Sequence, residues 1–177
     1  MNNTSNPHRR SGVAMLVVAW LLLFGGGYWF FENWSARQYN PNADLAQQQD
    51  VAEVVLERNR LGHYVADGEI NGQPVTFLLD TGASQIALST RLARELGLKF
   101  RGAVTVQTAN GYVSGFQTRL ESVRLGSIEL HGVTALATDG IDYETVLLGM
   151  SFLKHVEFSQ RGSLLTLKPI ADQGSFE

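Results

Sequence analysis

The stretch that decides the fold is Phe77-Leu78-Leu79-Asp80-Thr81-Gly82-Ala83-Ser84, in a chain of 177 residues. Three large apolar residues lead directly into a carboxylate, a hydroxyl and a glycine. Burial raises the pKa of such a carboxyl group unless it is hydrogen-bonded or shared. Asp-Thr-Gly also fits an ordinary turn, in which the aspartate accepts from backbone amides and the glycine takes a positive φ. From these residues alone, a structural turn and a catalytic loop are both open.

Short strands and tight turns surround this stretch. Asn71-Gly72 and Asn110-Gly111 are strong hairpin signals. One clear helix is expected in LSTRLARELGL, with Ser89 as its N-cap and Gly97 as its stop. The pattern predicts an all-β domain, a closed or nearly closed barrel of about nine short strands with one or two short helices. The candidate strands are 54–56, 63–70, 75–79, 103–108, 112–120, 123–125, 128–130, 133–137, 145–148, 156–158 and 164–167.

Three motifs in order give a family resemblance. FLLDTGAS at residues 77–84 is the first, and VLLGMSFL at 146–153 is an apolar pair and glycine that run into a short helix. Between them, Asn110-Gly111 followed by Tyr112 lies where a flap hairpin would fall. Over roughly residues 54–168 the chain resembles the retropepsin-like aspartic proteases, and it looks closest to their membrane-anchored bacterial branch. The resemblance implies a retropepsin-like closed β-barrel.

The resemblance also implies roles for individual residues. Asp80 would be the catalytic acid and base. Thr81 would brace two loops across a two-fold axis, Gly82 would admit the substrate backbone, and Ser84 would hydrogen-bond the outer oxygen of Asp80. The remaining residues that it implies are Ala83 in the same loop, Thr108, Ala109, Asn110, Gly111 and Tyr112 in the flap, and Leu147, Leu148 and Gly149 behind the loop.

The chain supplies only one catalytic loop. Asp139-Gly140 follows a threonine and precedes no hydroxyl, so a surface turn is expected there. A working protease would therefore be a homodimer with one Asp80 from each subunit at the axis. Like charges about 3 Å apart cannot both ionise easily, so the pair would share a proton. Tyr112 could cover a bound peptide, or it could pack on its own sheet in an ordinary turn. Candidates for apolar pocket walls are Ile86, Leu88 and Val113, and each could equally be a core residue.

An apolar run near the N-terminus predicts one membrane span. Residues 13–31 carry no charge and, as a helix, would cover about 29 Å, close to the thickness of a bilayer core. Arg9-Arg10 before this run places the N-terminus in the cytoplasm and the domain across the membrane. The resemblance to the bacterial branch implies that this is an inner membrane and that the domain is periplasmic. A cleaved signal peptide and a buried core helix are the alternatives. The expected organisation is 1–12 cytoplasmic, 13–31 transmembrane, 32–50 polar tether, 51–170 protease domain and 171–177 tail.

Composition excludes several classes of function. The formal net charge is −3, which offers no basic footprint for nucleic acid. The chain has no cysteine, so a disulfide scaffold, a thiol nucleophile and a cysteine metal site are excluded. Its four histidines lie far apart without the spacing of a zinc hydrolase. No metal and no cofactor are expected.

Two functions other than proteolysis are open. The chain could be a membrane-anchored module that keeps the retropepsin fold and binds peptides or proteins without cleaving them. It could also be an envelope scaffold whose dimer is the function. The intact Asp80 loop favours an aspartic endopeptidase acting on a protein or peptide substrate, because a binder needs no carboxylate there. Replacement of Asp80 by Asn would separate these functions.

Overall fold

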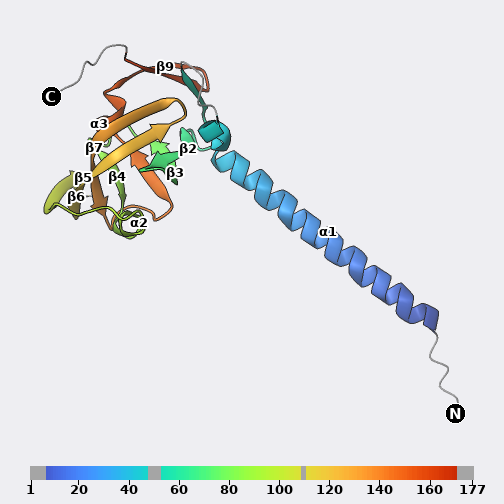
Figure 1. The fold of residues 1–177 in the computed structure, drawn as a ribbon. Helices are drawn as coiled ribbons and strands as arrows, with labels where there is room; N and C mark the ends of the chain where they lie inside the picture. The colour runs from blue at the N-terminus through green and yellow to red at the C-terminus, as the bar shows by residue number, and fades with distance from the viewer. Residues whose placement is uncertain (1–6, 48–52, 109–110, 171–177) are drawn as a thin grey trace. The chain divides into compact units, whose positions relative to one another are not determined.

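The computed structural model describes residues 7–47, 53–108 and 111–170. The chain divides into two compact units, Met1–Gln38 and Tyr39–Glu177. The first unit is helical, and all strands of the described chain lie in the second (Figure 1).

One long helix, α1 (Pro7–Tyr39), contains the predicted span. Residues Ala14–Tyr39 form a stretch of 26 residues whose most apolar window of 18 residues has a mean hydropathy of 1.8, and none of that window is buried within the chain. By length and composition this helix can cross a membrane.

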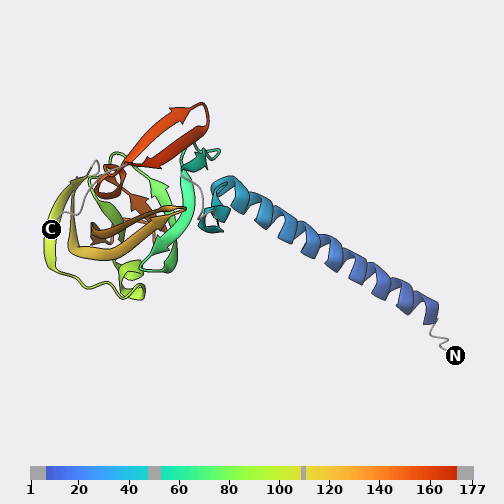
Figure 2. The same ribbon diagram turned by 45° about the horizontal axis from the view of Figure 1, so that its top comes forward.

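The second unit is built on a seven-stranded sheet in the order β2-β3-β8-β4-β7-β6-β5. β2 also pairs with β6 through Glu69↔Arg124 and Ile70↔Val123, so the sheet curls back on itself (Figures 1 and 2). The all-β prediction is confirmed, but the barrel is not strictly closed, because this contact is short and β5 stays at an edge. The seven strands are β2 (Val65–Ile70), β3 (Gln73–Leu79), β4 (Ile86–Ser89), β5 (Gly102–Thr108), β6 (Gly111–Leu125), β7 (Ile128–Thr138) and β8 (Thr145–Leu148).

A second, smaller sheet has the order β1-β10-β9. Its strands are β1 (Val54–Glu57), β9 (Val156–Arg161) and β10 (Leu164–Pro169), and Figure 2 shows β9 and β10 as a hairpin. Val54, Leu56, Leu165 and Leu167 from this sheet are buried in the core of the unit. Burial of such side chains contributes roughly 1.5–3 kcal/mol each, so the small sheet is part of the fold and not an appendage.

The helix expected after the Asp80 stretch is present. α2 (Thr90–Glu95) begins after Ser89, whose hydroxyl accepts a hydrogen bond from the Leu92 backbone amide at 3.1 Å. Gly97, at φ +68°, ends it as predicted. The other short helices are α3 (Met150–Leu153) and the 3₁₀ helix η1 (Ala43–Gln47).

Two long strands replace four of the short ones that the sequence predicts. β6 and β7 keep one register from Leu125↔Ile128 to Gly115↔Thr138, with Glu121 and Gly132 as the one unpaired position. This position lies within the breaks that the sequence predicts, and Gly132 has φ +66° there. The pairing resumes on both sides of it, so each strand continues through the predicted break.

Residues 39–45 belong to the compact unit, although the sequence places them in a polar tether. The buried Asn42 side chain donates to the carbonyls of Glu57 and Val65 at 2.9 and 2.7 Å and accepts from the Glu57 amide at 2.7 Å. Leu45 is buried in the core. A polar sequence is compatible with burial here because backbone groups from distant strands satisfy the asparagine.

Candidate active site

Asp80 lies directly after β3, where the strand turns into a loop. Its backbone amide donates to the Leu148 carbonyl at 3.2 Å, and its carbonyl accepts from the Ala83 amide at 3.2 Å. One carboxylate oxygen, Oδ1, accepts from the Gly82 amide at 2.8 Å. The side chain is half-buried. The carboxylate is therefore oriented by one backbone amide, that of Gly82, while it still has access to solvent.

The strand and helix of the second motif support this loop from behind. β3 and β8 pair in parallel through Leu78↔Leu147 and Leu79↔Leu148. The Met150 amide, at the start of α3, donates to the Ala83 carbonyl at 2.8 Å. The parallel pair of strands thus places the second motif beside the loop, as the resemblance implies.

Gly149 permits this close approach. A Cβ atom at residue 149 would overlap the backbone carbonyl oxygens of Ala83 and Gln85. Ser151, two residues further on, accepts a hydrogen bond from the Ile86 amide at 2.9 Å and so holds the other end of the loop. The sequence singled out Gly149, but Ser151 was missed because its partner is a backbone amide distant in sequence.

The other loop residues lie at the surface of the single chain. Thr81, Gly82 and Ser84 are exposed and Ala83 is half-buried. Within the described chain, no hydrogen bond joins Ser84 to Asp80; the amide of Gly82 takes that position at Oδ1. The role expected for Thr81 involves a second subunit and stays a prediction.

The expected flap is the end of the β5–β6 hairpin. Thr108 and Gly111 are the last residue pair of its ladder, and Gly111 has φ +110°. Ala109 and Asn110 lie outside the described residues. Tyr112 is 76% exposed. The hairpin therefore presents an aromatic side chain that its own sheet does not cover.

Two candidates for pocket walls are core residues instead. Ile86 and Leu88 are fully buried in β4, a strand that the sequence analysis missed. All four residues of β4 are buried, so the alternation that marks a half-buried strand is absent. Val113, the third candidate, is half-buried and stays a prediction.

Comparison with known proteins identifies the family. A family model described as "gag-polyprotein putative aspartyl protease" matches residues 66–155, more than half of the chain. The chain belongs to this family. A crystal structure of a retropepsin-like aspartic protease from Rickettsia conorii is similar, with a TM-score of 0.56 and 34% sequence identity over 66% of this chain and 90% of that one. The retropepsin-like assignment made from the three motifs is thus confirmed.

Two curated relatives are similar in sequence. "Uncharacterized protein in cobV 5'region" from Sinorhizobium sp is 35% identical over 119 residues, 66% of this chain and 51% of that protein. "Uncharacterized protein RP867" from Rickettsia prowazekii (strain Madrid E) is 30% identical over 148 residues, 80% of this chain and 63% of that protein. The chain thus spans between half and two thirds of the length of these relatives.

A cluster of three side chains fastens the segment that leads into β8. The Tyr143 hydroxyl donates to the Glu95 carboxylate, and the Arg91 guanidinium lies 4.0 Å from the centre of the Tyr143 ring. The hydrogen bond from Tyr143 lowers the pKa of Glu95, and Arg91 lowers it further; the same hydrogen bond raises the pKa of Tyr143.

Proposed function

We propose that the chain is an aspartic endopeptidase whose active form is a homodimer, with one Asp80 from each subunit at a two-fold axis. The observation that carries the proposal is the Asp80 loop itself: a carboxylate oriented by the Gly82 amide and backed by Gly149, in a member of an aspartic protease family. An aspartate that accepts from a backbone amide also fits an ordinary turn, so the match to an aspartic protease family is what favours a catalytic loop.

In the proposed mechanism the two carboxylates share one proton. The ionised carboxylate takes a proton from a water molecule between them, and that water attacks the peptide carbonyl. The protonated partner hydrogen-bonds the oxygen on which negative charge develops and later protonates the leaving amine.

The substrate is proposed to be an extended protein or peptide segment. It would add to the sheet as a strand, with main-chain hydrogen bonds for affinity and pockets for alternate side chains. The β5–β6 hairpin would close over it and exclude water, with Tyr112 as a cover. The large exposure of Tyr112 supports this role.

Membrane anchoring by α1 is part of the proposal. The apolar window of 18 residues within α1 supports a single span, and Arg9 and Arg10 before it favour a cytoplasmic N-terminus with the protease domain on the periplasmic side. Confinement to a membrane raises the effective concentration of subunits and so favours the dimer.

Cleavage of a peptide library tests the function. The full chain in detergent micelles is incubated with a diverse peptide mixture from pH 4 to 7, and new termini are identified by mass spectrometry. Asp80→Asn is the matched control. Cuts that vanish in the variant establish the protease. Sedimentation gives the oligomeric state, and circular dichroism shows whether the chain is folded. If a folded dimer makes no cuts, the chain is instead a peptide-binding module.

A further inference from the structure

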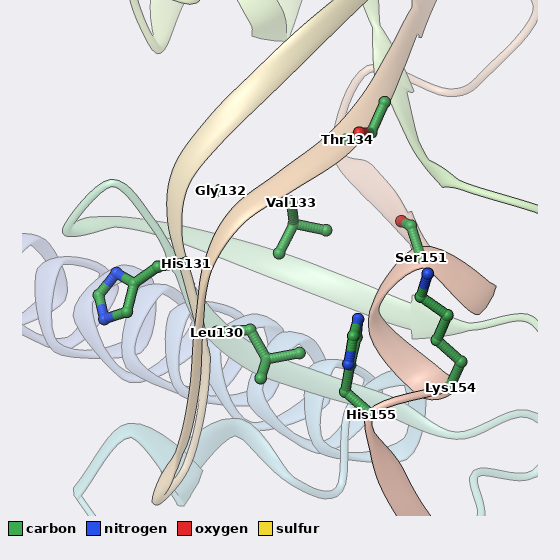
Figure 3. A pocket seen from close by; sticks show the side chains of 8 residues that line it. All are labelled: Leu130, His131, Gly132, Val133, Thr134, Ser151, Lys154 and His155. Atoms are coloured by element: carbon green, nitrogen blue, oxygen red, sulfur yellow. The ribbon is translucent and has the colours of Figure 1, made fainter. Parts of the chain in front are cut away.

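A small basic pocket lies between β7 and α3, outside the proposed catalytic dyad. Its volume is about 190 Å³, room for several water molecules or one small ion. Figure 3 shows it from close by. None of the described residues that line it is acidic; they are Leu130, His131, Gly132, Val133, Thr134, Ser151, Lys154 and His155.

Three hydrogen-bond donors enter this pocket from one side. In Figure 3 the Lys154 amine extends toward Ser151, and the His155 ring stands between Lys154 and Leu130, whereas the His131 ring points away. Within the described chain, neither Lys154 nor His155 has a carboxylate partner. An ammonium group, an imidazole and a hydroxyl thus surround a space without a negative charge to balance them.

Ser151 connects the pocket to the Asp80 loop. Its Oγ accepts from the amide of Ile86, the first residue of β4, at 2.9 Å. The hydroxyl proton is therefore available to donate elsewhere, and Ser151 lines the pocket. An acceptor in the pocket would polarise this hydroxyl and strengthen its hydrogen bond to Ile86.

We propose that this pocket binds a phosphate group, either inorganic phosphate or a small phosphomonoester, through Lys154, His155 and Ser151. A phosphate offers several strong acceptor oxygens and negative charge to three separate donors, and lysine binds it as a point charge. Bound phosphate would tighten the contact between Ser151 and Ile86 and so stiffen the loop that carries Asp80. An effect of this stiffening on peptide cleavage rests on the proposed function, whereas the binding of phosphate does not.

A second basic pocket supplies the matched control. It has a volume of about 380 Å³ and lies where α2 ends beside β6, with Lys99, Arg101 and Arg119 on its rim. Glu121 also lines it, which disfavours an anion there. A phosphate attracted by positive surface charge alone would respond to changes at either pocket.

The test measures phosphate binding to the full chain in a phosphate-free maltoside detergent. Isothermal titration calorimetry gives the affinity for phosphate. Mass spectrometry gives the rate of hydrogen exchange in the peptide that contains the Ile86 amide. All measurements use the Asp80→Asn background, so they do not depend on proteolysis. The variants are Lys154→Met and His155→Asn, with Lys99→Met and His131→Asn as controls. Sodium chloride at equal ionic strength is the blank.

We expect saturable binding of phosphate that Lys154→Met weakens by about tenfold or more, with a smaller loss in His155→Asn and none in the two controls. Phosphate should slow exchange at Ile86 in the background protein but not in Lys154→Met. Glycerol 3-phosphate is titrated in parallel: equal or tighter binding identifies a phosphomonoester site, and weaker binding identifies an inorganic phosphate site.

Absence of saturable binding at millimolar phosphate would overturn the proposal, as would binding that Lys154→Met leaves intact or that Lys99→Met abolishes. Lys154 is exposed, and thermal unfolding without phosphate checks that its replacement leaves the fold unchanged. If phosphate binds as expected while the unmodified chain cleaves no peptide, the proposed function fails and the phosphate site stands.

Discussion

The Asp80 loop and the β5–β6 hairpin differ in how the rest of the chain restrains them. The loop is held by Leu148, by Gly149 and by Ser151. At the hairpin end, β5 is an edge strand and Tyr112 is 76% exposed. A loop held at three points and a weakly held hairpin end are the combination that the proposed protease, with its closing flap, requires. Substitutions in the two regions should therefore affect stability and activity differently.

The largest effect is expected at the carboxylate itself. Asp80→Asn removes the group that would activate water, and we expect peptide cleavage to fall by on the order of 10³-fold or more. Stability should change little, because the asparagine Oδ1 can still accept from the Gly82 amide. Library cleavage and thermal unfolding in micelles measure the two quantities. Cleavage that persists in this variant would show that Asp80 is not catalytic.

A substitution behind the loop should reduce stability and activity together. Gly149→Ala places a methyl group against the carbonyls of Ala83 and Gln85, and the backbone must shift. We expect a loss of about 1–3 kcal/mol in the free energy of unfolding, because the interior is overpacked. Cleavage should fall as well, since the Asp80 loop moves. Urea unfolding and peptide cleavage measure both changes.

The matched control for that variant is Gly102→Ala. Gly102 also lies in a strand, β5, but a Cβ atom there meets nothing within 4 Å. Its replacement should change stability by less than about 0.5 kcal/mol. Equal losses in the two variants would mean that close approach at Gly149 does not matter to the loop.

At the flap, activity should change without stability. Tyr112→Ala removes an exposed ring, so the unfolding temperature should stay the same while KM for peptides rises by about tenfold, through loss of an aromatic contact with substrate. Tyr112→Phe should retain most of the activity. Leu61→Ala, at a site that is 71% exposed and far from the hairpin in sequence, is the control. A drop in stability for Tyr112→Ala would show that the ring packs on its own sheet.

The sequence predicts the Asp80 loop well because its determinants are local. Asp80 and Gly82 lie two positions apart in one short motif, and the α2 cap at Ser89 depends on a residue only three positions away. Hydrogen bonds of this range depend on residue type and spacing, which a sequence displays directly.

Features that depend on distant residues escaped prediction. Asn42 reads as part of a tether until β1 and β2 provide the backbone groups that it binds. β4 is too short and too uniformly buried to show alternation. Tyr143 lies 48 residues from its partner Glu95, with nothing in its own segment to indicate the contact. Each of these features depends on contacts with distant residues, and its residue types alone are compatible with several structural roles.

The cluster of Arg91, Glu95 and Tyr143 allows the smallest but most specific test. In it an exposed segment is fastened by side chains, in contrast to the Asp80 loop, which is fastened mainly through backbone groups. Tyr143→Phe removes the largest cause of the lowered Glu95 pKa, so that pKa should rise toward its ordinary value of 4.5, with Arg91 still lowering it. Carboxyl-carbon NMR titration measures this shift, and Glu53, which is paired with Lys168 away from the cluster, serves as the internal control.

The pH dependence of stability follows from the signs of the two shifts. Glu95 has a lowered pKa in the folded chain, so its contribution is present above pH 4.5 and is lost as the pH falls through the folded value. Tyr143 has a raised pKa, so its contribution is present below pH 10.0 and is lost as the pH rises through the folded value. Thermal unfolding of the unmodified chain should show a loss of stability at acid pH and another at alkaline pH. Tyr143→Phe should show a smaller loss of stability at acid pH and no alkaline loss from residue 143. Unchanged acid behaviour in that variant would mean that the hydroxyl does not bind Glu95 in solution, and the segment before β8 would then be as weakly held as the flap.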